Sequence, residues 1–309
     1  APGKFTRGLA YFDKHLWAND SQSDKIYQMV VDDGETIRKT NPHHAKVTYT
    51  HQVTNFGPGM LKELDVHIAI PKSRKNQELD QEPSFTPAYT EEAADQWGQK
   101  TAHFSDKQIE PGEMVNYEME VEATTYDTRW FIFPDKVGSL DDIPDAIKNR
   151  YLKNNEKYQY DHPIIRNGIK EALGDQTSDN PYWKARALFN YLIDNMYYEM
   201  VGGWNTAPTV LDRGNGSCSE YTFVYIAMCR AIGIPARYVG SLVIRGDDAS
   251  LDDVFHRWPE IYLPNYGWVP VDPSGGDQKL PRDQANYIGH LSHRFLITTQ
   301  SGGGSETME

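Results

Sequence analysis

The sequence has few cysteines, few positive charges and no long apolar run. Only Cys218 and Cys229 carry thiols among its 309 residues. No stretch approaches the roughly 18 consecutive apolar residues of a membrane-spanning helix, so we expect no membrane span. Lys and Arg number 31 against 44 Asp and Glu, which gives a formal net charge of −13. Because an acidic surface is repelled by phosphate backbones and anionic lipids, we expect no nucleic-acid partner.

The compartment is indicated only indirectly. Two cysteines that do not pair give no information on redox conditions. The chain starts at Ala1 without an initiator methionine or the apolar region of a signal peptide, and it contains 19 Tyr and 7 Trp. We therefore expect an exported bacterial protein, periplasmic or extracellular, from which the signal has been removed.

Residues 26–135 alternate polar and apolar side chains, as strands do. The alternation is clearest over residues 46–55, 62–71 and 113–123, with a Gly-Pro-Gly turn between the first two segments. Strands with a period of two, separated by Gly and Pro turns, predict an antiparallel β-sandwich. A chain of this length has room for about two domains, and we take this region as the first.

The segments around the β region are less regular. Residues 1–25 hold large apolar residues at helical spacing, namely Phe5, Leu9, Phe12 and Leu16. We expect a short N-terminal arm there that packs on the body. Residues 80–105 are acidic and contain proline, which predicts a long connection. At the other end, residues 301–309 are typical of a flexible tail.

Helical patterns dominate the start of residues 136–300, which we take as the second domain. We expect a short helix within residues 143–152 and an amphipathic helix over 162–174 that ends at Gly174. Asn180 and Pro181 are suited to the N-cap and first position of a third helix. We expect Trp183 and Leu188 on the core side of that helix. A strand over residues 234–246 and a last strand within 274–299 complete this domain, with His290 and His293 at the surface.

Cys218 follows the turn Gly214-Asn215-Gly216-Ser217. The next residues, up to Gly233, are apolar on a broad face and predict a mostly buried helix. At a helix start, free N–H groups and the positive end of the dipole stabilise a thiolate, as a nucleophilic cysteine requires. The alternative is a small buried hydrophobe, which is what we expect for Cys229 in mid-helix. The two thiols would lie roughly 16 Å apart along a continuous helix and could not pair.

A hairpin follows this helix. Residues 254–264 alternate as a strand, and residues 267–273 return after the turn-forming Asn265-Tyr266-Gly267. In a short-looped hairpin, His256 and Asp272 have the same parity near its open end. They can therefore lie on one face, where the carboxylate orients the imidazole and supports its positive charge.

These pieces resemble the core of the transglutaminase-like superfamily, which has a papain-like α+β fold. The matching residues are the glycine turn with Cys218, Gly-Ile-Pro-Ala-Arg at 233–237, His-Arg-Trp-Pro-Glu at 256–260 and Gly-Trp-Val-Pro-Val-Asp-Pro at 267–273. They occur in the family's order, and the clear match covers roughly residues 160–275. The resemblance implies that Cys218 is the nucleophile, His256 the general base and acid, and Asp272 the residue that orients His256.

The residue types and the resemblance together predict attack of a thiolate on an amide carbonyl of a peptide or protein substrate. The resulting acyl-enzyme passes to water in a peptidase or amidase and to an amine in a transglutaminase. We favour hydrolysis slightly. Two other interpretations remain open: a non-catalytic binding scaffold on the same fold, and a zinc site held by the same three side chains.

Acyl transfer also needs hydrogen-bond donors for the developing oxyanion. The backbone N–H of Cys218 is one candidate, because it lies at a helix start. For the second donor we single out the indole N–H of Trp204, on a Gly-Gly loop, with Tyr198 as its competitor. Packing of Trp204 without a catalytic role is an equally open interpretation.

We expect no cofactor and no bound metal. His43 and His44 form an adjacent pair, but no spaced partner in the sequence completes a site, and we interpret them as part of a solvated loop. The aspartates of residues 246–254 could hold calcium, yet their spacing differs from that of an EF-hand loop, which favours a solvated loop. Arg237 is expected to form a structural ion pair, and His51 and His67 to be structural or solvated.

Overall fold

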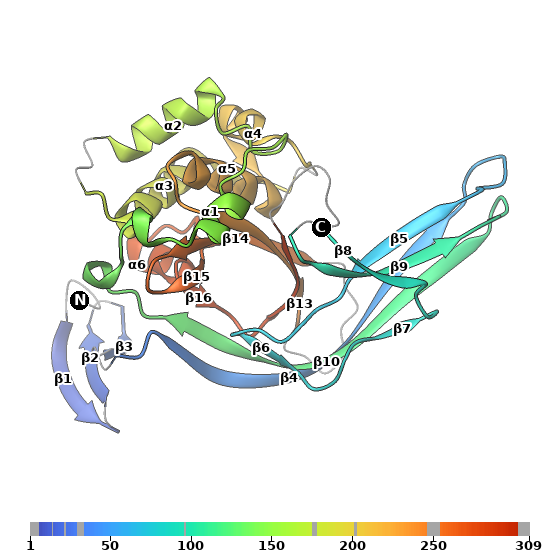
Figure 1. Cartoon of the computed structure of the whole chain (residues 1–309). Helices are drawn as coiled ribbons and strands as arrows, with labels where there is room; N and C mark the ends of the chain where they lie inside the picture. Colours follow the sequence, from blue (N-terminus) through green and yellow to red (C-terminus); the bar gives the residue numbers. More distant parts are fainter. Residues whose placement is uncertain are drawn as a thin grey trace.

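The structure is a computed structural model. It describes residues 6–13, 15–21, 23–29, 34–95, 97–174, 178–200, 203–245 and 254–301. Helices gather on one side of the molecule, a curved sheet lies beneath them, and two long strands run under that sheet and project outward (Figure 1). The expected α+β architecture, with an antiparallel β-sandwich ahead of a domain of helices and a sheet, is confirmed.

The helices and the sheet beneath them form what we call the body. The helices are α1 Asp145–Tyr151, α2 Pro163–Leu173, α3 Pro181–Asn195, α4 Ala207–Arg213, α5 Cys218–Ala231 and α6 Pro281–Gln284. Short 3-10 turns lie at Pro134–Lys136, Leu140–Asp142 and Ala285–Tyr287. The sheet is antiparallel with strand order β15-β14-β13-β17. Its strands are β13 Ala236–Val243, β14 Phe255–Leu263, β15 Gly267–Pro270 and β17 Phe295–Ser301.

Helix α5 is the centre of the body. Every residue from Cys218 to Arg230 is buried, because α2, α3 and α4 pack around the helix and the sheet covers its remaining side. The buried Arg230 guanidinium is satisfied by backbone carbonyls, donating to Ala236 O at 2.6 and 3.0 Å and to Lys153 O at 2.8 Å. A helix held on all sides fixes the position of the residue at its N-terminus.

The caps expected for the preceding helices are present. The Asn180 side chain accepts a hydrogen bond from the Tyr182 N–H, with Pro181 at the first position of α3. Gly174 follows the last residue of α2. Leu188 is fully buried on α3, but the expectation for Trp183 was wrong, since 40% of its surface is exposed. Trp183 packs edge to face on Tyr182 instead of entering the core.

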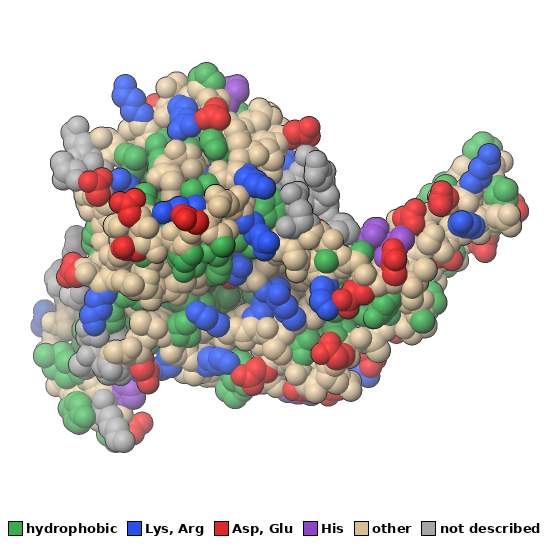
Figure 2. Space-filling view, viewed as in Figure 1, with side chains coloured by type: hydrophobic (Ala, Val, Ile, Leu, Met, Phe, Trp, Pro, Cys, Tyr) green, Lys and Arg blue, Asp and Glu red, His purple; other side chains and the backbone are tan. Residues whose placement is uncertain are grey.

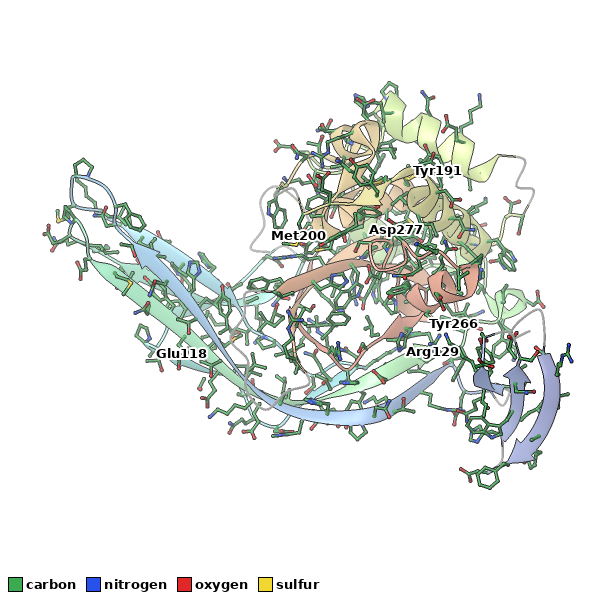
Figure 3. All side chains as sticks on the ribbon, turned by 180° about the vertical axis from the view of Figure 1, so that it is seen from behind. Glu118, Arg129, Tyr191, Met200, Tyr266 and Asp277 are labelled. Atoms are coloured by element: carbon green, nitrogen blue, oxygen red, sulfur yellow. The ribbon has the colours of Figure 1, made fainter. Side chains whose placement is uncertain are left out.

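The β-sandwich is built on two long paired strands, β4 Ile37–Thr54 and β10 Met114–Trp130. Strand β10 also pairs with β6 Gln77–Leu79, β7 Ser84–Thr86 and β16 His290–Leu291. A second sheet, in the order β5-β9-β8, faces them. It comprises β5 Leu64–Ala69, β8 Glu91–Ala94 and β9 Lys100–Asp106. Seen from behind, Glu118 lies on the projecting sandwich and Tyr191 among the helices (Figure 3).

The sandwich and the body share a core. Phe104 and Met119 of the sandwich belong to one buried cluster with Ile244 and Leu296 of the body. The buried Gln77 side chain joins the two parts by donating to Ile297 O at 2.9 Å and accepting from Ile297 N at 2.7 Å. Lys and Arg side chains gather on the front face between the helices and the long strands (Figure 2). The domain boundary near residue 135 stays a prediction.

Two segments differ from expectation at the level of secondary structure. Residues 6–29 form a three-stranded sheet instead of following the helical spacing of their apolar residues. Its strands are β1 Thr6–Phe12, β2 His15–Asp20 and β3 Lys25–Met29. Asp13, with φ of 47°, turns the chain between the first two strands. The apolar residues before and after this turn therefore belong to two separate strands and not to one helix. Residues 80–105 are also not a plain connection, because pairing with β10 and β9 makes strands of their polar segments.

Two histidines expected at the surface are partly buried. His290 starts β16, where burial lowers its pKa to about 4. His293 is bonded through Nδ1 to Asp127 Oδ1 at 2.9 Å. Both lie where the C-terminal segment packs on β10, a tertiary contact that local sequence does not reveal. Among the described residues, no helix is long and apolar enough to cross a membrane.

Candidate active site

Cys218 is the first residue of α5 and is only 7% exposed. Gly214, with φ of 77°, ends α4 in the left-handed conformation, and the chain then forms the short strand β12 Asn215–Gly216. This strand pairs in parallel with β11 Tyr197–Tyr198, which follows α3. The helix start therefore lies against a turn that is fixed from both sides, with the Cys218 N–H free of any intrahelical partner.

His256 and Asp272 meet at the open end of the β14–β15 hairpin. Strand β14 pairs with β15, and the Val271 N–H still donates to Pro259 O at 2.9 Å beyond the strand end. His256 Nε2 lies 2.6 Å from Asp272 Oδ2. The side chains are 19% and 13% exposed. The structure thus brings these two residues together, as the parity of the hairpin predicts.

The other face of the imidazole meets Cys218. Nε2 is occupied by Asp272, so Nδ1 is the ring nitrogen that is available to the thiol. Burial alone would raise the pKa of the Cys218 thiol, but a hydrogen bond and positive charge from His256, with a bond from the Arg257 backbone N–H, lower it below its ordinary value. Burial likewise would lower the pKa of His256, but the charge and hydrogen bond of Asp272 outweigh it and raise that pKa. These shifts favour a thiolate–imidazolium pair.

The Asp272 carboxylate is held through both oxygens. Burial would raise its pKa, yet the charge of His256 lowers it. Oδ1 accepts from the Ser274 hydroxyl at 3.0 Å and from the Gly275 N–H at 2.8 Å. A Cβ at Gly275 would come within 2.6 Å of Asp272 Oδ2 and of the Tyr287 ring, so only glycine allows this close approach. The carboxylate therefore has one orientation in which to hold His256.

The segment that carries these three side chains is similar to known proteins. Residues 170–273 match the sequence model of the transglutaminase-like superfamily. The chain carries a transglutaminase-like core. This core extends from the middle of α2 to the residue after Asp272 and thus includes all three side chains described above.

The relatives are distant. Over 145 residues the chain is 28% identical to an uncharacterized protein of Haemophilus influenzae, covering 40% of this chain and 38% of that protein. Over 159 residues it is 26% identical to the uncharacterized protein YebA of Bacillus subtilis, covering 42% of this chain and 21% of YebA. A crystal structure described provisionally as a cysteine protease, from Cytophaga hutchinsonii, has a TM-score of 0.58 at 16% identity, with 83% of each chain covered. That likeness extends the shared fold beyond the core.

Two side chains within the transglutaminase-like core remain candidates for the second oxyanion donor. The ring of Trp204 lies 5.5 Å from that of Phe223 and 6.3 Å from that of Tyr238, and it is 45% exposed. Tyr198 pairs with Gly216. Burial raises the pKa of Tyr198, and the negative charges of Cys218 and Asp272 raise it further. The charge of Cys218 therefore acts on Tyr198, and Trp204 stays a predicted donor.

Glu220 was not singled out from the sequence, although Ser217-x-x-Glu220 is a capping-box pattern. Its side chain is fully buried and accepts from the Ser217 N–H at 3.2 Å. It also accepts from Asn205 Nδ2 at 2.8 Å and from Arg213 Nη2 at 2.9 Å. One carboxylate thus fastens the loop before α4, the end of α4 and the start of α5. Its position two residues after Cys218 makes it a support of the site.

Among the described residues, a cluster of ligand atoms close enough to hold a metal ion lies in the β-sandwich. His44 is in strand β4, not in a loop, and its Nε2 lies 2.8 Å from Asp80 Oδ2 and 3.1 Å from Glu122 Oε1. The three ligand atoms could hold an ion, but the contacts of the His44 ring with the two carboxylates already explain their proximity. The aspartates of the candidate calcium loop, residues 246–253, lie outside the described residues. Arg237 forms its expected ion pair, with Glu260 at 2.6 Å.

Proposed function

We propose that this protein is a cysteine-nucleophile enzyme that cleaves or transfers the acyl group of an amide bond in peptide or protein substrates. Cys218 is the nucleophile, His256 the general acid and base, and Asp272 the residue that orients the imidazole. The observation that carries the proposal is the arrangement of His256, bonded to Asp272 through Nε2 at 2.6 Å and interacting with Cys218 on its other side. A buried thiol in such a position gains nucleophilicity that a structural cysteine lacks.

The reaction follows from these positions. The Cys218 thiolate attacks the carbonyl carbon, and the backbone N–H of Cys218 donates to the oxyanion together with a second donor, Trp204 or Tyr198. The C–N bond breaks as His256 Nδ1 gives its proton to the leaving amine, and a thioester remains. Water then attacks the thioester while the imidazole takes its proton, which releases the acid and restores the thiolate. An amine in place of water would give a new amide.

Water is the acceptor that we propose, because a small acceptor needs no binding site of its own. A scaffold without activity is the competing function, since nothing in the fold itself requires turnover. The lowered pKa of Cys218 speaks against the scaffold, because a purely structural buried thiol is expected to have a raised pKa, as Cys229 has.

The test is the rate of alkylation by iodoacetamide as a function of pH, measured by intact mass in the wild type, His256→Ala and Cys218→Ala. We expect one adduct on the wild type well below the ordinary pKa of a thiol, about 8.5. At pH 6 the rate should fall about tenfold or more in His256→Ala, because the thiolate loses its counter-charge. A Cys218 thiol that reacts only at alkaline pH and is indifferent to His256 would support the scaffold instead.

Turnover is the second readout. Peptide libraries are incubated with and without a labelled primary amine, so that hydrolysis and amine transfer give products of different mass. We expect hydrolysis that is abolished in Cys218→Ala and retained in Cys229→Ala, because Cys229 is buried in mid-helix. Equal turnover in the wild type and Cys218→Ala would show that Cys218 is not the nucleophile.

A further inference from the structure

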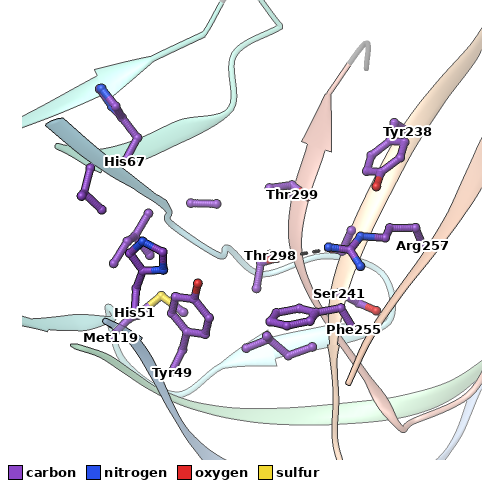
Figure 4. Close-up of a pocket in the computed structure, with 15 residues that line it drawn as sticks. Tyr49, His51, His67, Met119, Tyr238, Ser241, Phe255, Arg257, Thr298 and Thr299 are labelled. Atoms are coloured by element: carbon purple, nitrogen blue, oxygen red, sulfur yellow. Dashed lines mark hydrogen bonds between the residues drawn. The ribbon is translucent and has the colours of Figure 1, made fainter. Parts of the chain in front are cut away.

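A cavity of about 270 Å³ lies between the β-sandwich and the body. Strands β4, β5 and β10 line it from the sandwich, and β13, β14 and β17 line it from the body. Tyr49 and His51 face Arg257 and Phe255 across it (Figure 4). The rings of Tyr49 and Phe255 meet edge to face, 6.3 Å apart, and join the two walls.

Apart from histidine, Arg257 is the one charged side chain among the described residues that line the cavity. Among the described residues, no Asp or Glu lines the cavity, although the protein has 44 acidic residues and a formal net charge of −13. Within the described part of the chain, no carboxylate forms an ion pair with Arg257. Its guanidinium instead lies 5.2 Å from the centre of the Phe255 ring and 5.9 Å from that of Trp204. A partly buried cation in such surroundings attracts an anion.

The backbone connects this cation to the reaction. The Arg257 backbone N–H lowers the pKa of the Cys218 thiol. The hydroxyl of Tyr238, which lines the cavity, lies 3.5 Å from the hydroxyl of Ser219, the residue after Cys218. Successive side chains of a strand point to opposite faces, and therefore Arg257 leaves β14 on the face opposite His256. His256 serves the leaving amine, so the acyl portion of a substrate extends to the other side, toward the cavity.

The opposite wall supplies polar groups that complement a bound anion. The positive charge of Arg257 acts on the Tyr49 phenol, whose pKa burial raises. The His67 side chain lines the same wall, and Thr299 lines the cavity from the body. Hydroxyl and imidazole N–H groups donate hydrogen bonds to carboxylate oxygens, while the Tyr49, Met119 and Phe255 side chains exclude water.

We propose that this cavity binds a carboxylate carried by the acyl portion of the substrate, with Arg257 as its ion-pair partner. The inference rests on the proposed function and specifies its substrate class: acyl donors that are acidic near the scissile amide. The planar guanidinium matches a carboxylate in two parallel hydrogen bonds, which gives selectivity against the neutral amide of the same shape. The β-sandwich thereby becomes part of the substrate site.

The test uses peptide vinyl sulfones, which alkylate thiolates without turnover. Acetyl-Ala-Glu and acetyl-Ala-Gln vinyl sulfones differ only in a side-chain carboxylate. A third probe, a γ-linked glutamyl vinyl sulfone, carries a free α-carboxylate instead. We expect the wild type to react with one of the two acidic probes about tenfold faster or more than with the Gln probe, because a charge-assisted pair is broken in the latter. The faster acidic probe identifies the source of the carboxylate.

Variants assign the preference to Arg257. Arg257→Gln should abolish the preference for the acidic probe over the Gln probe. Arg257→Lys should keep part of this preference, because the positive charge remains but the two parallel N–H donors of the guanidinium are lost. Arg166→Gln, on α2 away from the cavity, removes the same charge and should keep the full preference. Equal rates for all three probes in the wild type, or an unchanged preference in Arg257→Gln, would overturn the inference. Failure of Cys218 to react with any probe or with iodoacetamide would overturn the proposed function instead.

Discussion

At the scale of single residues, Asp272 controls the ionisation of the other two members of the proposed triad. The negative charge of Asp272 favours the imidazolium form of His256, and the positive charge of the imidazolium in turn favours the thiolate of Cys218. Asp272→Asn keeps the shape and one hydrogen bond but removes the charge. The pKa of His256 should therefore fall and that of Cys218 should rise, so the pH range of the ion pair narrows from both ends.

We expect the alkylation midpoint of Asp272→Asn to move to higher pH and the alkaline limb of turnover to move to lower pH. Turnover at neutral pH should fall by about 10²–10⁴-fold, the usual contribution of general acid–base catalysis. Alkylation and turnover profiles measured on the same preparation test this. Ser274→Ala is the control, because it removes one hydrogen bond to Oδ1 and leaves the charge. A profile identical to that of the wild type would contradict the role of Asp272.

A second residue-scale question concerns the oxyanion. Tyr198→Phe and Trp204→Phe each remove one donor and retain a ring. Loss of an oxyanion donor costs about 10²–10³-fold in kcat, whereas the alkylation rate of Cys218 should hardly change. We expect the larger kcat loss for Tyr198→Phe, because the charge of Cys218 acts on its hydroxyl. A loss confined to Trp204→Phe would favour the indole donor, and no loss in either variant would exclude both.

The positions of Cys218, His256 and Asp272 were predictable from local patterns. A glycine turn before an apolar helix and a short hairpin each restrict the backbone over a few residues, so side-chain parity follows. Glu220 and Arg257 could have been noticed, one in a capping box and the other beside His256. Their roles depend on partners far along the chain, such as Asn205 and Tyr49, and no local pattern identifies such partners.

At the scale of elements, the network of Glu220 keeps the start of α5 in place. Glu220→Gln keeps the size of the side chain but leaves Arg213 without its charge partner. Breaking a buried ion pair from one side destabilises strongly, and we expect the free energy of unfolding to fall by about 2–4 kcal/mol. Cys218 alkylation at neutral pH should also slow, because the helix start loses its fixed position.

Denaturant unfolding and iodoacetamide kinetics on the same variant measure the two effects. Glu171→Gln is the matched control, since it removes an acid on α2 that bonds the Tyr191 hydroxyl at 3.0 Å at the surface. That change should cost less than about 1 kcal/mol. Wild-type stability in Glu220→Gln would show that the network is not required.

The elements themselves were predicted unevenly. Helices α2, α3 and α5 carry their own caps and apolar faces, so their ends follow from sequence. Strands β7, β8 and β9 do not, because most of their residues are acidic or polar. They form strands only by pairing, β7 with β10, β9 with β5 and β8 with β9. The N-terminal strands were not predicted, because a turn at Asp13 divides the apolar residues between two strands, and their spacing across that turn resembles the spacing of a helix.

At the scale of the whole molecule, the sequence predicted two domains but not their contact. Alternation in residues 113–123 indicates which side chains of β10 are buried, but it does not indicate which residues they pack against. In the structure, Met119 shares its cluster with Leu296, which belongs to the last strand of the body. A shared core makes the sandwich and the body a single cooperative unit.

Leu296→Ala tests this cooperation. Leu296 is fully buried in the shared cluster, so its truncation should lower the free energy of unfolding by about 2–5 kcal/mol. If the two parts unfold together, amide hydrogen exchange should accelerate in β10 of the sandwich as well as in α5 of the body. Leu280→Ala, at a position that is 46% exposed, should leave both unchanged. Acceleration confined to β13 and β17, with β10 still protected, would mean that the sandwich opens independently of the body. In that case the cavity beside Arg257 could open and close without loss of the proposed triad.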